Sequence, residues 1–96
     1  MTLLRTLALL PVAGLLAGCL GMMPEGVEET DVEAYDTAAA SIGCQMVGES
    51  DYRAVEFQAG LTREQAISIT ELKLARGQAE RLADGGVRLI AGPCAA

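Results

Sequence analysis

Apolar side chains recur at three- and four-residue spacing in three stretches of the chain, which is the pattern of one buried helix face. The pattern predicts helices over residues 31–47, 51–59 and 63–84. The stripe of the first helix consists of five side chains: Val32, Tyr35, Ala39, Ile42 and Met46. The main stripe of the third consists of six: Ile69, Leu72, Ala75, Ala79, Leu82 and Ala83. The second helix is short, so packing must hold it in place.

Polar residues and glycines set the predicted helix ends. Thr62 and Gln65 have the spacing of a capping box at the start of the third helix. Thr30 or Asp31 is placed to cap the first helix and Ser50 to cap the second, because their side chains accept backbone N–H groups. Glycine is favoured where a helix ends in a left-handed residue, and the expected ends are Gly48, Gly60 and Gly85-Gly86.

The C-terminal segment, residues 87–90, favours an extended conformation and precedes Gly92-Pro93-Cys94. No other convincing strand is visible for it to pair with, so we expect an extended arm and no sheet. Gly77, inside the third predicted helix, costs about 1 kcal/mol relative to Ala or marks a close contact. The predicted fold class is therefore all-α, a small three-helix domain with an extended C-terminal arm.

The composition limits what this fold can do. The chain has 96 residues, of which 51% are hydrophobic and 3% aromatic, so we expect one small domain with a thin core. It contains no His, which excludes Ser-His-Asp and Cys-His catalysis and every His-ligated metal site. The expectation is a protein that is no enzyme and holds no metal or cofactor.

The first 18 residues have the organisation of an export signal, with one early charge, Arg5, and an apolar run over residues 7–16. The run is shorter than the roughly 20 residues that a membrane-spanning helix needs. The segment leads into four residues: Leu16, Ala17, Gly18 and Cys19. They resemble the lipobox of bacterial lipoproteins. The alternatives are an ordinary secretory signal with a chance Cys near the cleavage point, or an uncleaved anchor.

The resemblance implies that the chain is cut before Cys19, that the Cys19 thiol carries diacylglycerol, and that the new amine is acylated as well. Two or more acyl chains make membrane attachment stable. In the enterobacterial sorting pattern an Asp after the acylated Cys retains a lipoprotein in the inner membrane, whereas Leu20 stands here. The resemblance therefore implies a lipid-anchored protein of the bacterial outer membrane that faces the periplasm.

Residues 19–30 follow as a predicted flexible, acidic tether, and residues 31–96 form the predicted domain. All 13 acidic residues but only 6 of the 7 basic ones lie after residue 18, so the side chains of this part carry a net charge of −7. That charge disfavours nucleic-acid binding, because phosphates would be repelled. Four basic residues alternate with acidic ones and indicate a solvated helix face: Arg63, Lys73, Arg76 and Arg81.

Cys44 and Cys94 remain after lipidation of Cys19, and an even pair in a small exported domain predicts a disulfide. Such a bond would pin the C-terminal arm across the first helix. A redox site is the alternative, but the two cysteines are 50 positions apart and form no Cys-x-x-Cys motif. We therefore expect a structural bond that staples the small domain.

These features predict a membrane-tethered periplasmic lipoprotein with a structural or accessory role, which binds a protein partner of the envelope. A second hypothesis is a lipid-binding or membrane-active domain of saposin-like or bacteriolytic type, because exposed apolar patches can bind lipid. A third is an enzyme that acts on the cell wall through paired carboxylates, with four candidates: Glu56, Glu64, Glu71 and Glu80. Thirteen acidic residues make chance pairs frequent, so binding is the favoured function.

Overall fold

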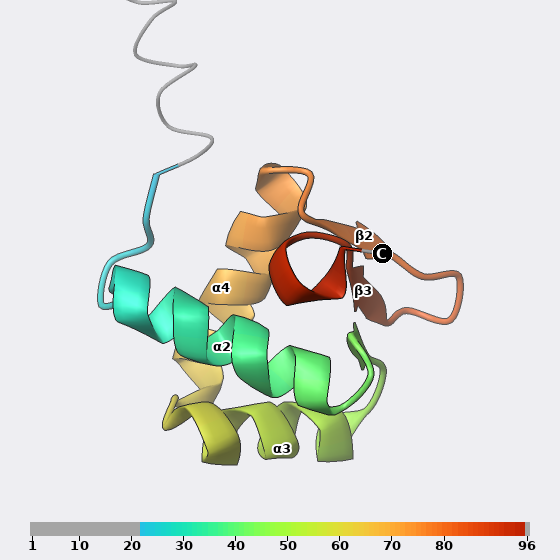
Figure 1. The fold of residues 1–96 in the computed structure, drawn as a ribbon, viewed down its shortest axis with the longest axis horizontal. Helices are drawn as coiled ribbons and strands as arrows, with labels where there is room; N and C mark the ends of the chain where they lie inside the picture. The colour runs from blue at the N-terminus through green and yellow to red at the C-terminus, as the bar shows by residue number, and fades with distance from the viewer. Residues whose placement is uncertain (1–21, 96) are drawn as a thin grey trace, which may run out of the picture.

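The computed structural model describes residues 22–95. This part of the chain forms three α-helices: α2 (Glu29–Ser41), α3 (Glu49–Ala59) and α4 (Arg63–Ala75). It also forms three short strands: β1 (Gln45–Met46), β2 (Ala79–Arg81) and β3 (Val87–Leu89). A 3₁₀ helix, η1 (Gly92–Cys94), follows the last strand, and Figure 1 shows the whole arrangement.

The three strands form one antiparallel sheet in the order β1-β3-β2, so the all-α prediction is wrong and the domain is a mixed α/β fold. Val87 pairs with Met46 on one side and with Arg81 on the other, which makes β3 the central strand. The predicted C-terminal arm is thus the middle of a sheet. Its two neighbours come from residues that the helical pattern had assigned to the first and third helices.

The first helix is shorter than predicted because the chain turns sharply after Ser41. Gly43 and Cys44 both take left-handed backbone angles, with φ of 93° and 65°. The N–H of Cys44 donates to the carbonyl of Ala39 at 2.9 Å and closes the helix end. The next residues are extended, so Met46 belongs to β1, and it is still buried, as its place in the predicted stripe required.

The third helix also ends early, because Gly77 takes a left-handed φ of 71°. The N–H of Gln78 closes this end by donating to a carbonyl of the last turn. The glycine that was predicted to weaken a longer helix is therefore its stop signal. Gly85 and Gly86, the predicted stop, lie instead in the turn between β2 and β3, where the N–H of Leu82 donates to the carbonyl of Gly86.

The capping box at the start of α4 is confirmed. The N–H of Thr62 donates to Oε1 of Gln65 at 2.9 Å, and the N–H of Gln65 donates to Oγ1 of Thr62 at 3.1 Å. Gly60 is confirmed as the residue that ends α3, with a left-handed φ of 68°. Together these two features set the sharp turn between α3 and α4.

The predicted caps of the other two helices are wrong: Thr30 or Asp31 for α2, and Ser50 for α3. Both helices begin slightly earlier, and carboxylates of the first turn reach back over the helix start. Oδ2 of Asp31 accepts the N–H of Glu28 at 3.0 Å, and Oδ2 of Asp51 accepts the N–H of Val47 at 2.9 Å. Acidic side chains near a helix N-terminus also interact favourably with its dipole.

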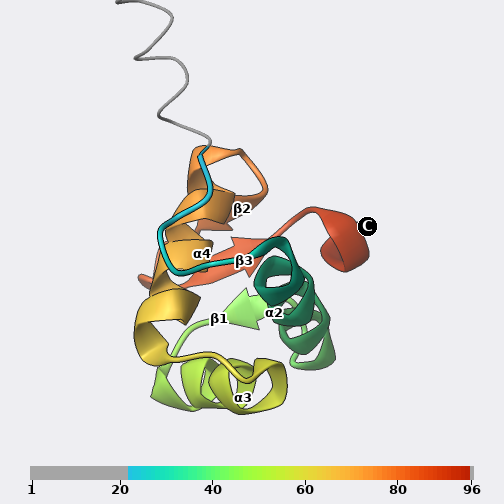
Figure 2. The same ribbon diagram turned by 90° about the vertical axis from the view of Figure 1, so that its left-hand side faces the viewer.

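The core lies where the helices and the sheet meet (Figure 2). Its largest fully buried side chains are four: Tyr35, Met46, Val55 and Ile69. Ala38 and Ala39 are also buried, so part of the buried face of α2 consists of small side chains. Phe57, in contrast, is 90% exposed, so among residues 22–95 Tyr35 is the fully buried aromatic side chain. The core is accordingly small, as the composition implied.

A short chain of hydroxyl groups anchors Tyr35 within this core. Its phenol oxygen lies 2.7 Å from Oγ1 of Thr70 on α4 and 3.3 Å from Sδ of Met46 on β1. The Thr70 hydroxyl donates to the carbonyl of Ala66 at 2.8 Å. In the contact between Tyr35 and Thr70 either hydroxyl can be the donor, and the Tyr35 hydroxyl also donates to the thioether of Met46. The phenol thereby joins α2, α4 and β1.

The predicted disulfide between Cys44 and Cys94 is confirmed, with a Cα–Cα distance of 5.7 Å. It links the turn after α2 to η1, which packs against α2. Closing a loop of 50 residues removes unfolded-state entropy equivalent to about 4 kcal/mol. This bond fixes the C-terminal segment after it leaves β3.

An ion pair connects α4 with α2 beneath the same C-terminal segment. Nζ of Lys73 lies 2.8 Å from Oδ1 of Asp36, and the Lys73 side chain is only 8% exposed. A Cβ added to Gly92 in η1 would lie 3.9 Å from Oδ2 of Asp36, so η1 sits close to the pair. The interpretation of Lys73 as part of a solvated face is therefore wrong.

The chain joins the domain before α2. Met23 packs against the core, and Val27 is 6% exposed and belongs to the core. The N–H of Val27 donates to the carbonyl of Pro24 at 3.2 Å, and Nε2 of Gln65 donates to the carbonyl of Gly26 at 3.0 Å. The folded unit therefore includes residues 23–30, which the sequence pattern assigned to the tether.

The variant Tyr35→Phe keeps the ring and removes the hydroxyl. Burial raises the pKa of Tyr35 from 10.0 to about 12, so the folded state holds the phenol proton more tightly than the unfolded chain does. The corresponding stability is complete below pH 10.0 and is lost as pH rises to about 12. It amounts to about 3 kcal/mol. We expect urea unfolding across this range to show a flatter alkaline loss for Tyr35→Phe, and a cost of about 0.5–1.5 kcal/mol at neutral pH.

The matched control is Tyr52→Phe, whose ring is only partly buried. It should keep most of the alkaline loss of the wild type, because burial is the largest cause of the raised pKa of Tyr35 and the charge of Tyr52 is a smaller one. Equal alkaline profiles for wild type and Tyr35→Phe would contradict the role of the buried phenol.

Candidate interaction surface

The site residues predicted from the sequence fall in two places. The lipobox lies outside the described residues: Leu16, Ala17, Gly18 and Cys19. Cys44 and Cys94 form the disulfide and are a structural feature of the domain. A different surface feature of residues 22–95 is a pocket between α3 and α4.

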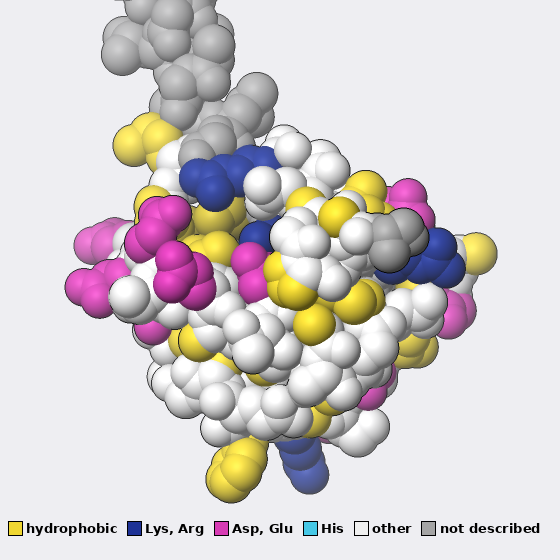
Figure 3. All heavy atoms as spheres, viewed as in Figure 1, with side chains coloured by type: hydrophobic (Ala, Val, Ile, Leu, Met, Phe, Trp, Pro, Cys, Tyr) yellow, Lys and Arg dark blue, Asp and Glu magenta, His cyan; other side chains and the backbone are white. Residues whose placement is uncertain are grey.

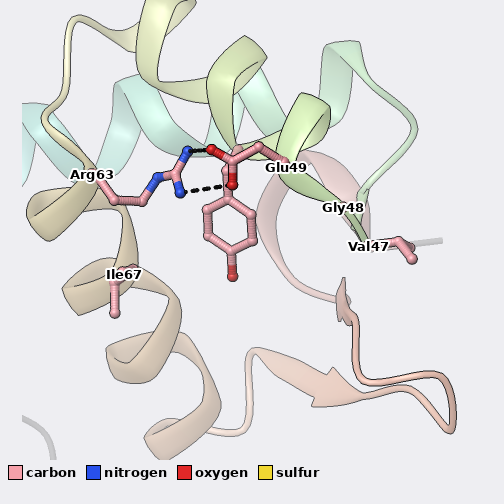
Figure 4. Close-up of a pocket in the computed structure, with 6 residues that line it drawn as sticks. Val47, Gly48, Glu49, Arg63 and Ile67 are labelled. Carbon is pink, nitrogen blue, oxygen red and sulfur yellow. Dashed lines mark hydrogen bonds and ion pairs between the residues drawn. The ribbon is translucent and has the colours of Figure 1, made fainter.

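This pocket has a volume of about 290 Å³ and is open to solvent. It is lined by six residues: Val47, Gly48, Glu49, Tyr52, Arg63 and Ile67. Figure 4 shows Arg63 and Ile67 projecting from α4 on one side, with Val47, Gly48 and Glu49 on the other. Two walls from separate helices therefore enclose it.

Local sequence explains why these walls meet. Gly60 reverses the chain after α3, and the buried Leu61 holds the turn against the core. Thr62 caps α4, so Arg63 is the first residue of that helix and lies beside α3. The start of α3 is fixed by Asp51, whose carboxylate accepts the N–H groups of the preceding residues. The pocket is built from two helix starts that are both held by caps.

Arg63 is the central charged group of the pocket. Its Nη1 and Nη2 donate to the two carboxylate oxygens of Glu49 at 3.0 and 2.7 Å, as the dashed lines in Figure 4 mark. Its Nε donates to Oε2 of Glu56. The guanidinium carbon lies 5.3 Å from the centre of the Tyr52 ring, within the range of a cation–π contact. All three nitrogens are engaged, so the guanidinium is held in one orientation.

Arg63 and Glu49 each stabilise the charged form of the other. Hydrogen bonds from Arg63 hold the pKa of Glu49 below its usual value of 4.5. Hydrogen bonds to Glu49 and then to Glu56 raise the pKa of Arg63 above its usual value. Arg53 adds a weaker contact, with Nε 3.6 Å from Oε1 of Glu49. Arg63 and Glu49 therefore both stay charged at neutral pH.

The part of the pocket left open to a partner is apolar at its rim. Val47 is 47% exposed and Ile67 is 42% exposed. Small-molecule pockets usually have volumes of about 300–1,000 Å³, so this one is at the lower limit. Arg63 is committed to its carboxylates and acts by shaping the pocket.

Sequence reasoning missed this site, because Arg63 was interpreted as part of a solvated face. Its main partner Glu49 lies 14 residues away on another helix, and no helical spacing connects the two. One signal was present. A cation at the first residue of a helix is unfavourable next to the positive end of the dipole, so Arg63 after a capping box indicates compensating carboxylates nearby.

Among residues 22–95, no three side chains of His, Cys, Asp or Glu type lie together as a metal site would require. No helix in this range has the length and apolar character needed to cross a bilayer. Comparison with protein-family models, curated proteins and solved structures finds no match for the chain.

The variant Glu49→Gln tests the Arg63 clamp through pH. The pKa of Glu49 is lower in the folded state than its usual 4.5, so the unfolded chain binds more protons as the pH falls. The contribution of the pair is present above pH 4.5 and is lost as pH falls through the folded pKa. We expect the loss of stability below pH 4.5, measured by urea unfolding, to be smaller in Glu49→Gln than in the wild type.

The control is Glu71→Gln, which changes an exposed acid in α4 and should behave like the wild type. A wild-type acid profile for Glu49→Gln would argue against the clamp.

Proposed function

We propose that this chain is a bacterial lipoprotein whose small disulfide-bonded domain is an accessory binding module of the envelope. The observation that carries the proposal is the lipobox-like run Leu16-Ala17-Gly18-Cys19 after an apolar export segment. In the proposal, Cys19 carries the lipid anchor and the domain stands in the periplasm. Leu20 after Cys19 favours the outer membrane.

The disulfide supports an exported location. Bonds of this kind form and persist in oxidising compartments such as the periplasm, and small exported domains depend on them when their cores are thin. Cys44 and Cys94 are bonded, and the core around them contains one fully buried aromatic ring among the described residues, that of Tyr35. Both features fit a domain that folds after export.

The pocket supports a binding role. Its exposed rim, Val47 and Ile67, offers apolar surface. Exposed apolar side chains around a preformed pocket are typical of protein-binding surfaces. The proposed partner is an envelope protein that inserts an apolar side chain between α3 and α4. Its surface would be basic, to complement the acidic domain.

The variant Cys19→Ala tests the anchor. Without the thiol no diacylglycerol can be attached, so we expect the protein to leave the membrane fraction or to accumulate as uncut precursor. Membrane fractionation and intact mass measurement report both outcomes. Leu20→Asp is the control, since it keeps the thiol and should stay membrane-bound. Unchanged mature tethering of Cys19→Ala would exclude the lipoprotein assignment.

Site-specific photocrosslinking tests the partner surface. A photoreactive residue in place of Ile67 should crosslink one envelope protein in living cells. The same residue in place of Glu33, which is exposed on α2, should not. The Ile67 crosslink should weaken strongly when Val47→Asp puts a charge on the opposite wall. Crosslinks of equal yield from both positions, or an Ile67 crosslink that Val47→Asp leaves unchanged, would contradict docking at the pocket.

A further inference from the structure

Very few residues separate the proposed lipid anchor from the folded domain. Met23 already packs against the core, and the carbonyl of Pro24 is hydrogen-bonded to Val27. Only Leu20, Gly21 and Met22 stand between Cys19 and Met23. The acidic segment beyond them is part of the domain and adds no length to the connection.

Covalent geometry limits how far the domain can move from its anchor. A fully extended chain advances at most 3.6 Å per residue, so the Cα atoms of Cys19 and Met23 are at most about 14 Å apart. The acyl chains of a lipidated Cys19 hold that residue at the bilayer surface. Met23 therefore stays within about 14 Å of the headgroups. For scale, a single helix with its side chains is about 10–12 Å wide.

The fold determines which end of the domain this brings to the membrane. Figures 1 and 2 both show the described chain starting at the end of the domain where α4 finishes and turns into β2. Both views place α3 at the opposite end. The pocket lies with α3, at the first turns of α4. From Arg63 to Ala75 the helix rises about 18 Å, which separates the pocket from the membrane-side end.

The side chains at the membrane-side end suit a lipid headgroup layer. Met22 is 65% exposed, and its flexible thioether side chain tolerates an apolar or interfacial setting. Arg76, the residue that follows the last turn of α4, lies at the same end. Ala75 beside it is small and exposed.

Acidic side chains close to the start of the domain determine which membrane surface it can approach. Figure 3 shows acidic side chains gathered over the start of α2, and Glu29 and Asp31 lie in its first turn. Glu25 and Glu28 are exposed just before it. An anionic bilayer would repel this group, whereas a zwitterionic surface would not. The short connection, and not charge attraction, therefore holds the domain down.

We infer that the domain of the lipidated protein is seated on a zwitterionic bilayer surface by its Met22–Arg76 end, with α3 and its pocket directed away from the membrane. This orientation rests on the proposed lipidation of Cys19. It presents the pocket to partners in the periplasm and excludes a partner from the space between the domain and the lipid.

Tryptophan fluorescence tests the orientation, because the chain contains no Trp. Single reporters are placed by Ala75→Trp at the membrane-side end and by Phe57→Trp on α3, both at exposed positions. The full lipoprotein, with acylation and the disulfide verified by mass, is reconstituted in phosphatidylcholine vesicles that contain a lipid with a nitroxide on its headgroup. The Ala75→Trp reporter should lose fluorescence relative to nitroxide-free vesicles, and the Phe57→Trp reporter should lose much less.

A length variant provides the matched control. An insert of about ten Gly and Ser residues between Gly21 and Met22 adds an average span of about 17 Å without changing the domain. It should remove most of the quenching of the Ala75→Trp reporter while the protein stays on the vesicles. Equal quenching of both reporters, or quenching that the insert leaves unchanged, would overturn the orientation. Lack of acylation on Cys19 would instead overturn the proposed function, and the orientation with it.

Discussion

The hydroxyl of Tyr35 joins α2 to two other elements, through Thr70 on α4 and Met46 on β1. The ring supplies volume that a core of alanines and short aliphatic side chains lacks, but its polar end has to be satisfied inside the core. Leaving a buried hydroxyl unpaired costs about 1–3 kcal/mol. Thr70 removes that cost only when α4 sits in one register against α2. The largest buried side chain thus also selects the relative position of the elements around it.

Met46 reaches Tyr35 because the chain reverses at Gly43 and Cys44, and the disulfide secures that reversal. The N–H of Leu89 donates to the carbonyl of Cys44 at 2.8 Å, which brings β3 alongside β1. The turn between β2 and β3 then closes over β1 at Gly86. A Cβ there would lie 3.0 Å from the carbonyl oxygen of Met46, closer than an ordinary contact, so glycine allows this approach without displacing β1. The small sheet is therefore positioned by three features: the disulfide-linked turn at Cys44, the hydrogen bond from Leu89, and the close approach at Gly86.

The helices could be predicted because their buried stripes extend over several turns and two of their ends carry strong signals, at Gly60 and Thr62. The strands could not, because two or three residues are too few to show alternation. Ala79 illustrates the problem, since it is buried in β2 yet stands four residues after Ala75 and fits the helical stripe equally well. The ion pairs that Arg63 and Lys73 form across helices were hidden for another reason. Lys73 and Asp36 are separated by 37 positions in the sequence, so no local sequence pattern indicates that they pair.

Helix α4 connects the features that matter for the proposed function. Its first residue, Arg63, shapes the pocket, its middle supplies Thr70 to the core, and its last turn lies at the end where the chain leaves toward Cys19. A pocket of about 290 Å³ makes few contacts, and such a surface alone gives weak binding. In the proposed function, a lipid anchor would offset this weakness, because a domain confined to the envelope meets an envelope partner at a high effective concentration. A small domain with a small pocket would then be sufficient for the proposed accessory role.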